Sequence, residues 1–425
     1  MHRLFLILGF AACLLRAADD QPRWRVLNQA ARQAAQAKDY AKLRAILLEL
    51  KPLMPGNPRI TYNLAASEAM LGQREVSLSH LRDLAGMGLV YDLPADADFT
   101  SLKNSPEFAA ILARMNENKR PVTHSTPAFT LAENDLLPED IAYDSKTRRF
   151  FVSSVRKAKI LTTGGEQFAK ADWSVLALAV DPERRILWAT TGWVPHCEHC
   201  DKADKDKTAL LAFDLDSHAL KQRIDSPVKG LLGDMTIGRR GDIYVSEGIH
   251  GAVFHLKPGG KQLERLDIPG QFPSPQTPAL SEDEKTLYVP DYARGIAAID
   301  LVHRTANWRT ATWLQPADDI ALNGIDGLYV YGNSFLAVQN GTNPPRVMKF
   351  SRDLQEQQVL EANTPGLGEP THGTLVGNIF YVIANTGWSA YDDKGVKKPE
   401  TAPVQSSIWK IPVSNVIADP GVREH

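Results

Sequence analysis

The sequence of 425 residues has little cysteine, no excess of charge of one sign and few long apolar runs. Its 48 basic residues nearly balance its 50 acidic residues, so it lacks the positive surface that nucleic acids or anionic membranes require. Three cysteines are too few for a fold that depends on a framework of disulfides. Beyond the first 18 residues no run is apolar enough to cross a bilayer. We therefore expect no transmembrane segment and no nucleic-acid partner.

Several catalytic motifs are also missing. The sequence contains no Gly-x-Ser-x-Gly elbow, no phosphate-binding Walker loop and no Gly-x-Gly-x-x-Gly dinucleotide fingerprint. Serine-hydrolase, nucleotide-hydrolase and Rossmann-type chemistry therefore have no support from a motif.

The first 18 residues are typical of a secretory signal peptide. A basic start is followed by an apolar run at 4–15 and by small residues at Ala17 and Ala18. We therefore expect a secreted or periplasmic protein. A lipoprotein anchor at Cys13 is the alternative, although the apolar Leu14 and Leu15 that follow argue against it.

Residues 22–116 have the 3.6-residue apolar period of helices and few β-branched runs. Asp39-Tyr40-Ala41 before one helix and Ala69-Met70-Leu71-Gly72 at the end of another resemble the tetratricopeptide repeat, with about two repeats and a capping segment. Such a domain either docks a protein partner or packs on the domain that follows. The polar stretch 117–127 is the expected linker.

From residue 128 to 413 the chain consists of short strands separated by turn signals, and 414–425 form a tail. Six strongly apolar strands recur at the spacing of propeller blades: 150–152, 187–189, 243–245, 287–289, 335–338 and 380–382. The sequence therefore predicts a mainly β protein with an α-helical N-terminal domain, namely a six-bladed β-propeller preceded by a short tetratricopeptide-like array.

The segments Pro138–Asp144, Thr277–Ser281 and Gly324–Leu328 resemble the gluconolactonase, regucalcin and luciferin-regenerating-enzyme family of six-bladed propellers. The resemblance implies an exported hydrolase of a lactone or related ester, assisted by a divalent cation such as Ca²⁺ in the central tunnel. The alternative is a non-catalytic propeller with a degenerate metal site, which binds a small molecule or a protein.

The same resemblance implies which residues form the site. The metal ligands would be Glu139, Asp234, Gln276 and Asp326, although Gly233 stands where the family has an asparagine ligand. Asp234 and His372 are the candidate catalytic bases. The residues expected to line the pocket are Arg156, Trp193, Tyr292, Asn340 and Thr371.

A second group of candidate ligands follows the second of the six strands. His196, Cys197, His199 and Cys200 are spaced closely enough to bind a soft metal ion. No second pair of cysteines is available to complete a structural zinc site. The open alternatives are therefore a local disulfide, free thiols or a metal.

Overall fold

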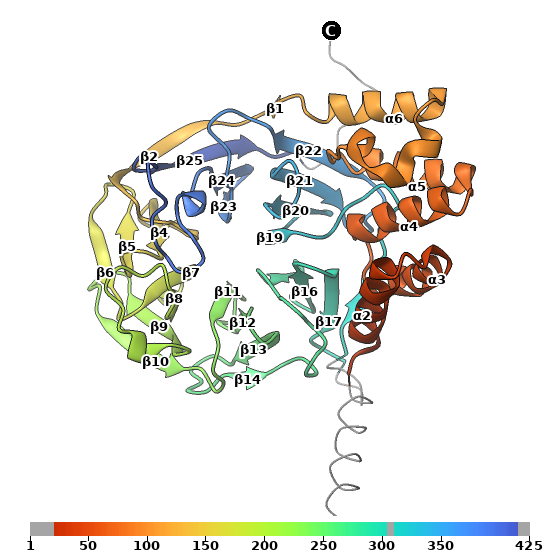
Figure 1. Cartoon of the computed structure of the whole chain (residues 1–425). Helices are drawn as coiled ribbons and strands as arrows, with labels where there is room; N and C mark the ends of the chain where they lie inside the picture. Colours follow the sequence, from red (N-terminus) through yellow and green to blue (C-terminus); the bar gives the residue numbers. More distant parts are fainter. Residues whose placement is uncertain (1–20, 304–309, 415–425) are drawn as a thin grey trace, which may run out of the picture.

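The computed structural model describes residues 21–303 and 310–414. The expected signal peptide, Cys13 and the tail beyond Ser414 lie outside the described residues. Six antiparallel sheets stand around a common axis, with helices beside part of the ring (Figure 1). The protein is therefore a six-bladed β-propeller with an N-terminal helical domain, as the sequence predicts.

Five of the sheets have four strands and that of blade 5 has five, and the first propeller strand of each blade lies nearest the axis. Blade 1 contains β3 (Ile141–Asp144), β4 (Arg149–Ser154), β5 (Lys159–Thr162) and β6 (Gln167–Lys170). Blade 2 contains β7 (Ser174–Asp181), β8 (Ile186–Gly192), β9 (Thr208–Asp214) and β10 (Leu220–Asp225). Blade 3 contains β11 (Leu232–Ile237), β12 (Ile243–Glu247), β13 (Ala252–Leu256) and β14 (Glu264–Arg265). Blades 4 and 5 are β15 (Ala279–Leu280), β16 (Thr286–Asp291), β17 (Gly295–Asp300) and β18 (Thr312–Trp313); and β19 (Ile325–Tyr331), β20 (Ser334–Gln339), β21 (Arg346–Ser351) and β22 (Gln357–Ala362).

Blade 6 closes the ring with strands from both ends of the propeller. It contains β23 (Gly373–Val376), β24 (Ile379–Ile383) and β25 (Gln405–Pro412), and its outer strand is β2 (Thr126–Asn134). Phe129 of β2 is paired with Ile408 of β25. The closed ring thus leaves no long unpaired sheet edge at the junction of its ends.

The six apolar strands that the sequence predicts correspond to the second strands of the blades, which are β4, β8, β12, β16, β20 and β24. All six residues of β20 are buried, because neighbouring blades cover both faces of its sheet. A strand covered on both faces has a continuous apolar run rather than an alternating one, which made these strands conspicuous in the sequence.

The helical domain contains α2 (Arg23–Gln36), α3 (Tyr40–Leu50), α4 (Pro58–Met70), α5 (Arg74–Gly86) and α6 (Pro106–Glu117). Side-chain caps begin three of them, at Asp39, Asn57 and Ser105. Three short 3₁₀ turns, η1 (Lys51–Leu53), η2 (Leu93–Ala95) and η3 (Ala97–Leu102), connect the helices. None of the described helices is long and apolar enough to span a membrane.

The helical domain is fixed to blades 4 and 5. Buried Arg294 donates to Leu53 O at 2.8 and 3.0 Å and lies over the ring of Trp313. Buried Arg346 donates to Met87 O at 2.5 Å. The alternative in which the helical domain packs on the next domain therefore agrees with the structure, and a protein partner for this domain stays a prediction.

The expected linker is partly a strand. Within 117–127, β1 (Val122–Thr123) pairs with β22 and extends blade 5 to five strands. The buried carboxylate of Glu361 accepts from the backbone nitrogens of His124 and Ser125. Its other oxygen accepts from Thr364 Oγ1 at 2.6 Å, so one side chain holds the passage between the domains.

Candidate active site in the central tunnel

Two acidic residues of the site, Asp234 and Asp326, lie at irregular points of innermost strands, whereas Glu139 precedes β3. The pairing of β11 with β12 shifts in register between Leu232 and Met235, which brackets Asp234. The pairing of β19 with β20 shifts between Ile325 and Gly327, which brackets Asp326. Bulges of this kind turn a side chain away from the regular alternation of a strand. Asp326 lies on the bulged start of β19.

Hydroxyl groups on the second strands hold the irregular backbone of blades 1 to 3. Ser153 Oγ accepts from Asp140 N at 2.9 Å, and Ser246 Oγ accepts from Asp234 N at 3.1 Å. In blade 2, Thr190 Oγ1 accepts from Ala177 N at 2.9 Å and donates to Gly233 O. These groups give partners to backbone atoms just before β3 in blade 1 and at the bulges of blades 2 and 3.

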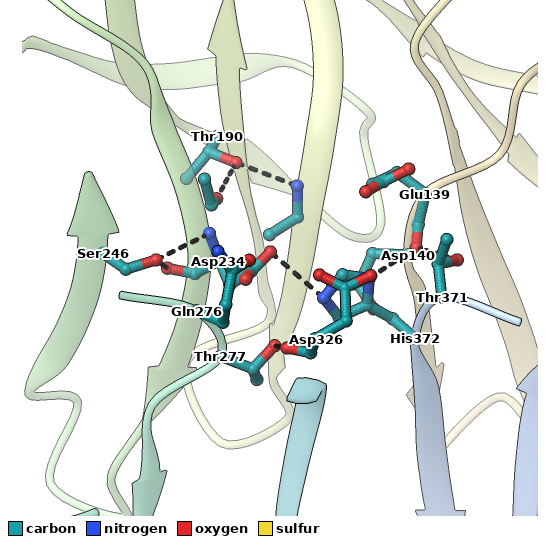
Figure 2. A network of polar contacts seen from close by, with 12 residues as sticks. Glu139, Asp140, Thr190, Asp234, Ser246, Gln276, Thr277, Asp326, Thr371 and His372 are labelled. Carbon is teal, nitrogen blue, oxygen red and sulfur yellow. Dashed lines mark hydrogen bonds and ion pairs between the residues drawn. The ribbon is translucent and has the colours of Figure 1, made fainter. Parts of the chain in front are cut away.

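Glu139, Asp326 and His372 converge from blades 1, 5 and 6 (Figure 2). One potential ligand atom from each lies within 4.8 Å of the others. His372 is buried, whereas Glu139 is partly exposed. Residues that are far apart in the sequence thus form one cluster at the axis, as the resemblance implies for Glu139 and Asp326.

The ring of His372 has a defined orientation. Its Nδ1 lies 2.9 Å from the backbone oxygen of Glu139, and because a carbonyl oxygen can only accept, Nδ1 carries a proton. The other nitrogen, Nε2, has no hydrogen-bond partner among the described residues, although Asp234 Oδ1 lies 3.2 Å away as an ion-pair contact. Nε2 is therefore free either to hold a second proton or to bind a cation.

The two carboxyl groups of the cluster are each held by one donor. Trp388 Nε1 donates to Glu139 Oε2 at 2.9 Å, and Asn340 Nδ2 donates to Asp326 Oδ2 at 2.6 Å. Each carboxyl group therefore keeps one oxygen that its fixed donor does not use. Such fixed outer partners orient the first-shell groups of a catalytic or metal site.

Burial and mutual repulsion change the acidity of the cluster. Burial and the charge of Asp326 raise the pKa of Glu139 to about 8, and burial raises the pKa of Asp326 to about 6. Burial would lower the pKa of His372, but the charges of Asp234 and Asp326 outweigh this effect and hold that pKa well above its usual value. Strongly perturbed groups in a cavity are typical of functional sites.

Asp234 and Gln276, the other predicted ligands, lie beside the cluster rather than within it. Asp234 is buried and contacts His372, and Figure 2 shows Gln276 on the Asp234 side of the group. Gln276 Nε2 donates to Ser274 Oγ at 3.0 Å. Gly233 offers no side chain. His372, predicted only as a base, takes the third position of the cluster.

The residues predicted to line the pocket lie at several places. Thr371 Oγ1 donates to Glu139 O at 2.9 Å, and Tyr292 donates to Asn340 Oδ1 at 3.0 Å, so both adjoin the cluster. Arg156 instead lies over the ring of Tyr391. Trp193 has a buried Nε1 without a hydrogen-bond partner among the described residues.

Cys197 and Cys200 form a disulfide, with Cα atoms 5.5 Å apart. Of the three alternatives that the sequence left open, the structure contains the local disulfide, and neither sulfur atom is then available as a free thiol or as a metal ligand. His196 packs edge-on against Trp388, with ring centroids 4.7 Å apart. The side chain of His199 is 79 % exposed.

Two residues that support the site were not among the predicted site residues. Asp140 accepts from Leu178 N and Ile141 N, both at 2.7 Å, and so joins blade 1 to blade 2; burial raises its pKa to about 7. Trp388 lies in the short turn η5 (Trp388–Ala390) and holds Glu139. Asp140 directly follows Glu139 in the sequence, and this adjacency is a signal that could have identified it as a site residue. Nothing in the sequence connects Trp388 with Glu139.

No family model matches the chain. No curated protein matches it either. Among solved structures, a luciferin-regenerating enzyme is similar, with 14 % sequence identity and a TM-score of 0.47 over 68 % of this chain and 95 % of that one.

Proposed function

We propose that the protein is a hydrolase that opens a lactone or a related ester at the tunnel cluster. The observation that carries this proposal is the convergence of Glu139, Asp326 and His372 within 4.8 Å, with Asp234 beside them. Buried carboxyl groups next to an imidazole supply both a base and a positive charge, which are the two requirements for attack of water on a carbonyl.

His372 and Asp234 have the two main parts in the proposed reaction. The carbonyl oxygen of the substrate lies against His372 Nε2, where positive charge stabilises the oxyanion. Asp234 removes a proton from water as the new carbon–oxygen bond forms. It returns this proton to the alkoxide when the ester bond breaks, so the step consumes one water and releases a hydroxy acid. The Nδ1 hydrogen bond of His372 keeps the ring in place throughout.

The positive charge at Nε2 is either a proton or a bound divalent cation. The donor set fits a cation, because Nε2 is a buried nitrogen without a hydrogen-bond partner among the described residues and faces carboxylates. Glu139, Asp326 and His372 would hold it. A mixed set of carboxylate and imidazole suits zinc or manganese better than Ca²⁺, which prefers six or more oxygen ligands. A cation would supply Lewis-acid polarisation of the carbonyl.

The test is a panel of lactones and simple esters. Asp234→Asn is expected to lower kcat/KM by about 10²–10⁴-fold, the usual contribution of a general base, with the loss in kcat. Asp225→Asn, which changes an exposed aspartate on β10, is the control and is expected to keep full activity. If the unmodified protein is inactive on every compound but binds some of them, the alternative of a non-catalytic propeller is favoured.

A further inference from the structure

A cavity of about 950 Å³ lies between the helical domain and the loops of blades 4 and 5. The helical side is formed by α2, α3 and α4 and by residues 89–92. The propeller side is formed by Tyr292, Ala293, Asn323 and 340–343. A cavity of this size is in the upper range for small-ligand sites, and neither domain forms it alone.

The walls of this cavity are joined by backbone hydrogen bonds. Leu322 N donates to Gly56 O at 2.8 Å, and Val90 N donates to Asn343 O at 2.9 Å. A side chain at position 56 would meet Leu322 at 2.9 Å, and the left-handed backbone there, with φ of +65°, also favours glycine. The cavity is therefore a built feature of the fold rather than a gap between domains that move independently.

Two lining residues connect the cavity to the tunnel cluster. Tyr292 donates to Asn340, and Asn340 donates in turn to Asp326. Burial, and to a smaller extent the charge of Asp326, raise the pKa of Tyr292 to about 12. The cavity and the cluster are therefore adjacent, and a chain of two hydrogen bonds joins them.

The cavity is rich in polar groups. Six of the 16 asparagines of the chain line it, together with two arginines. Asn57, Asn340 and Asn343 bond to other protein atoms. Asn28, Asn63 and the exposed Arg32 and Arg59 also line the cavity, and the buried Oδ1 of Asn323 has no hydrogen-bond partner among the described residues. Donors and acceptors that converge on one cavity are suited to bind a polar ligand.

We propose that this cavity binds a polyhydroxylated organic anion of the uronic-acid saccharide class. Arg32 and Arg59 would bind its carboxylates, because guanidinium groups pair with carboxylates in a bidentate manner. Asparagine amides offer a donor and an acceptor together, as hydroxyl groups do, so Asn28 and Asn63 match the hydroxyls. The binding of this ligand in the cavity is independent of the proposed function. Only the further step, in which its reacting carbonyl reaches the cluster, rests on the proposed function.

Calorimetric titration of the full chain with trigalacturonate and with a neutral galactose trisaccharide tests the proposal. The acidic sugar is expected to bind at least about tenfold more tightly, the effect of one charged hydrogen bond. Arg32→Gln and Arg59→Gln are each expected to lower the affinity for the acidic sugar about tenfold and to change the affinity for the neutral sugar little. Asn63→Asp is also expected to lower the affinity for the acidic sugar, because it places a like charge near the carboxylates.

Arg114→Gln, an exposed change on α6 outside the cavity, is the matched control and is expected to bind normally. Asp234→Asn separates the two proposals, because it is expected to remove hydrolysis but to keep trigalacturonate binding within about twofold. Equal binding of both sugars, binding insensitive to both arginine changes, or no binding at millimolar sugar would overturn the assignment. Binding of an acidic peptide in place of the sugars would overturn it too.

Discussion

His372 is the residue on which the chemistry that we propose depends. Its Nδ1 proton is fixed by the carbonyl of Glu139, so only Nε2 can change its state. A proton at Nε2 makes an imidazolium beside Asp234 and Asp326, and a cation at Nε2 makes a metal centre. Both states put positive charge at the same point, but they differ in their response to added metal.

Zinc or manganese is expected to stabilise the protein against heat more than calcium does. At one hundred times the dissociation constant, a bound ion adds about 2.7 kcal/mol to the free energy of unfolding. His372→Gln is expected to remove this stabilisation, because it deletes the nitrogen ligand. The melting temperature of metal-stripped protein, measured with each ion, checks the expectation. Equal stabilisation by calcium that survives His372→Gln would indicate an oxygen-only site.

Metal-free protein is expected to lose stability as the pH rises from about 5 to about 8. The pKa of Glu139 is raised to about 8 and that of Asp326 to about 6, so the folded state binds more protons than the unfolded state in this window. The raised pKa of His372 acts in the same direction above its usual value. The free energy of unfolding is therefore higher at the acid end of this window, and it falls by a few kcal/mol in all as the pH rises.

Urea unfolding in the presence of a chelator, at several pH values, measures this slope. Glu139→Gln is the informative comparison, because an uncharged amide replaces the carboxyl and the slope is expected to become flatter. A free energy of unfolding that increases with pH in the metal-free protein would contradict the assignment of raised pKa values.

At the scale of single elements, the regular strands were predictable and the bulges were not. The second strands are covered on both faces, so their apolar runs, such as Phe335–Val338, were visible without any alignment. The bulges at Asp234 and Asp326 depend on how two strands pair, which no local pattern encodes. The hydroxyls of Ser153 and Ser246 each lie three residues after the start of a predicted strand, which is a signal that sequence reasoning missed.

Glu361 tests the importance of the strand between the domains. Glu361→Ala leaves the backbone nitrogens of His124 and Ser125 without their acceptor. The hydroxyl of Thr364 loses one of its two acceptors and keeps Val122 O at 3.0 Å. We expect a loss of about 3 kcal/mol in the free energy of unfolding, because buried donors that lose a charged acceptor are costly. Urea unfolding measures it, and the exposed change Glu356→Ala on blade 5 is the control. A loss no larger than that of the control would show that β1 holds the linker without Glu361.

For the whole molecule, the propeller was predictable and the position of the helical domain was not. Six recurring strands imply six blades, and a closed ring implies that Glu139 and Asp326 approach each other. The sequence left open whether the helices dock a partner or pack on the propeller. The packing of the helices on the propeller depends on single long-range contacts. One of them is the hydrogen bond from Arg294 to Leu53 O, and these two residues are separated by more than half the chain.

Arg294→Met is expected to separate the unfolding of the two domains. The change removes the hydrogen bonds to Leu53 O and Gln271 O and leaves these buried acceptors unsatisfied. We expect one calorimetric transition in the unmodified protein and two in the variant, with a loss of about 3 kcal/mol. Arg240→Met, whose side chain is 84 % exposed, is the control. A single transition at an unchanged temperature would contradict the coupling.

The pairing of β2 with β25 has a consequence for synthesis. The helices and β2 leave the ribosome early, whereas the neighbour of β2 is among the last segments translated. A nascent chain that stops before Gln405 would carry the helical domain and five complete blades, yet it would expose the edges of both β2 and β24. Exposed edges recruit other chains, so premature termination near the 3′ end of the message is expected to yield aggregates rather than a shortened, working protein.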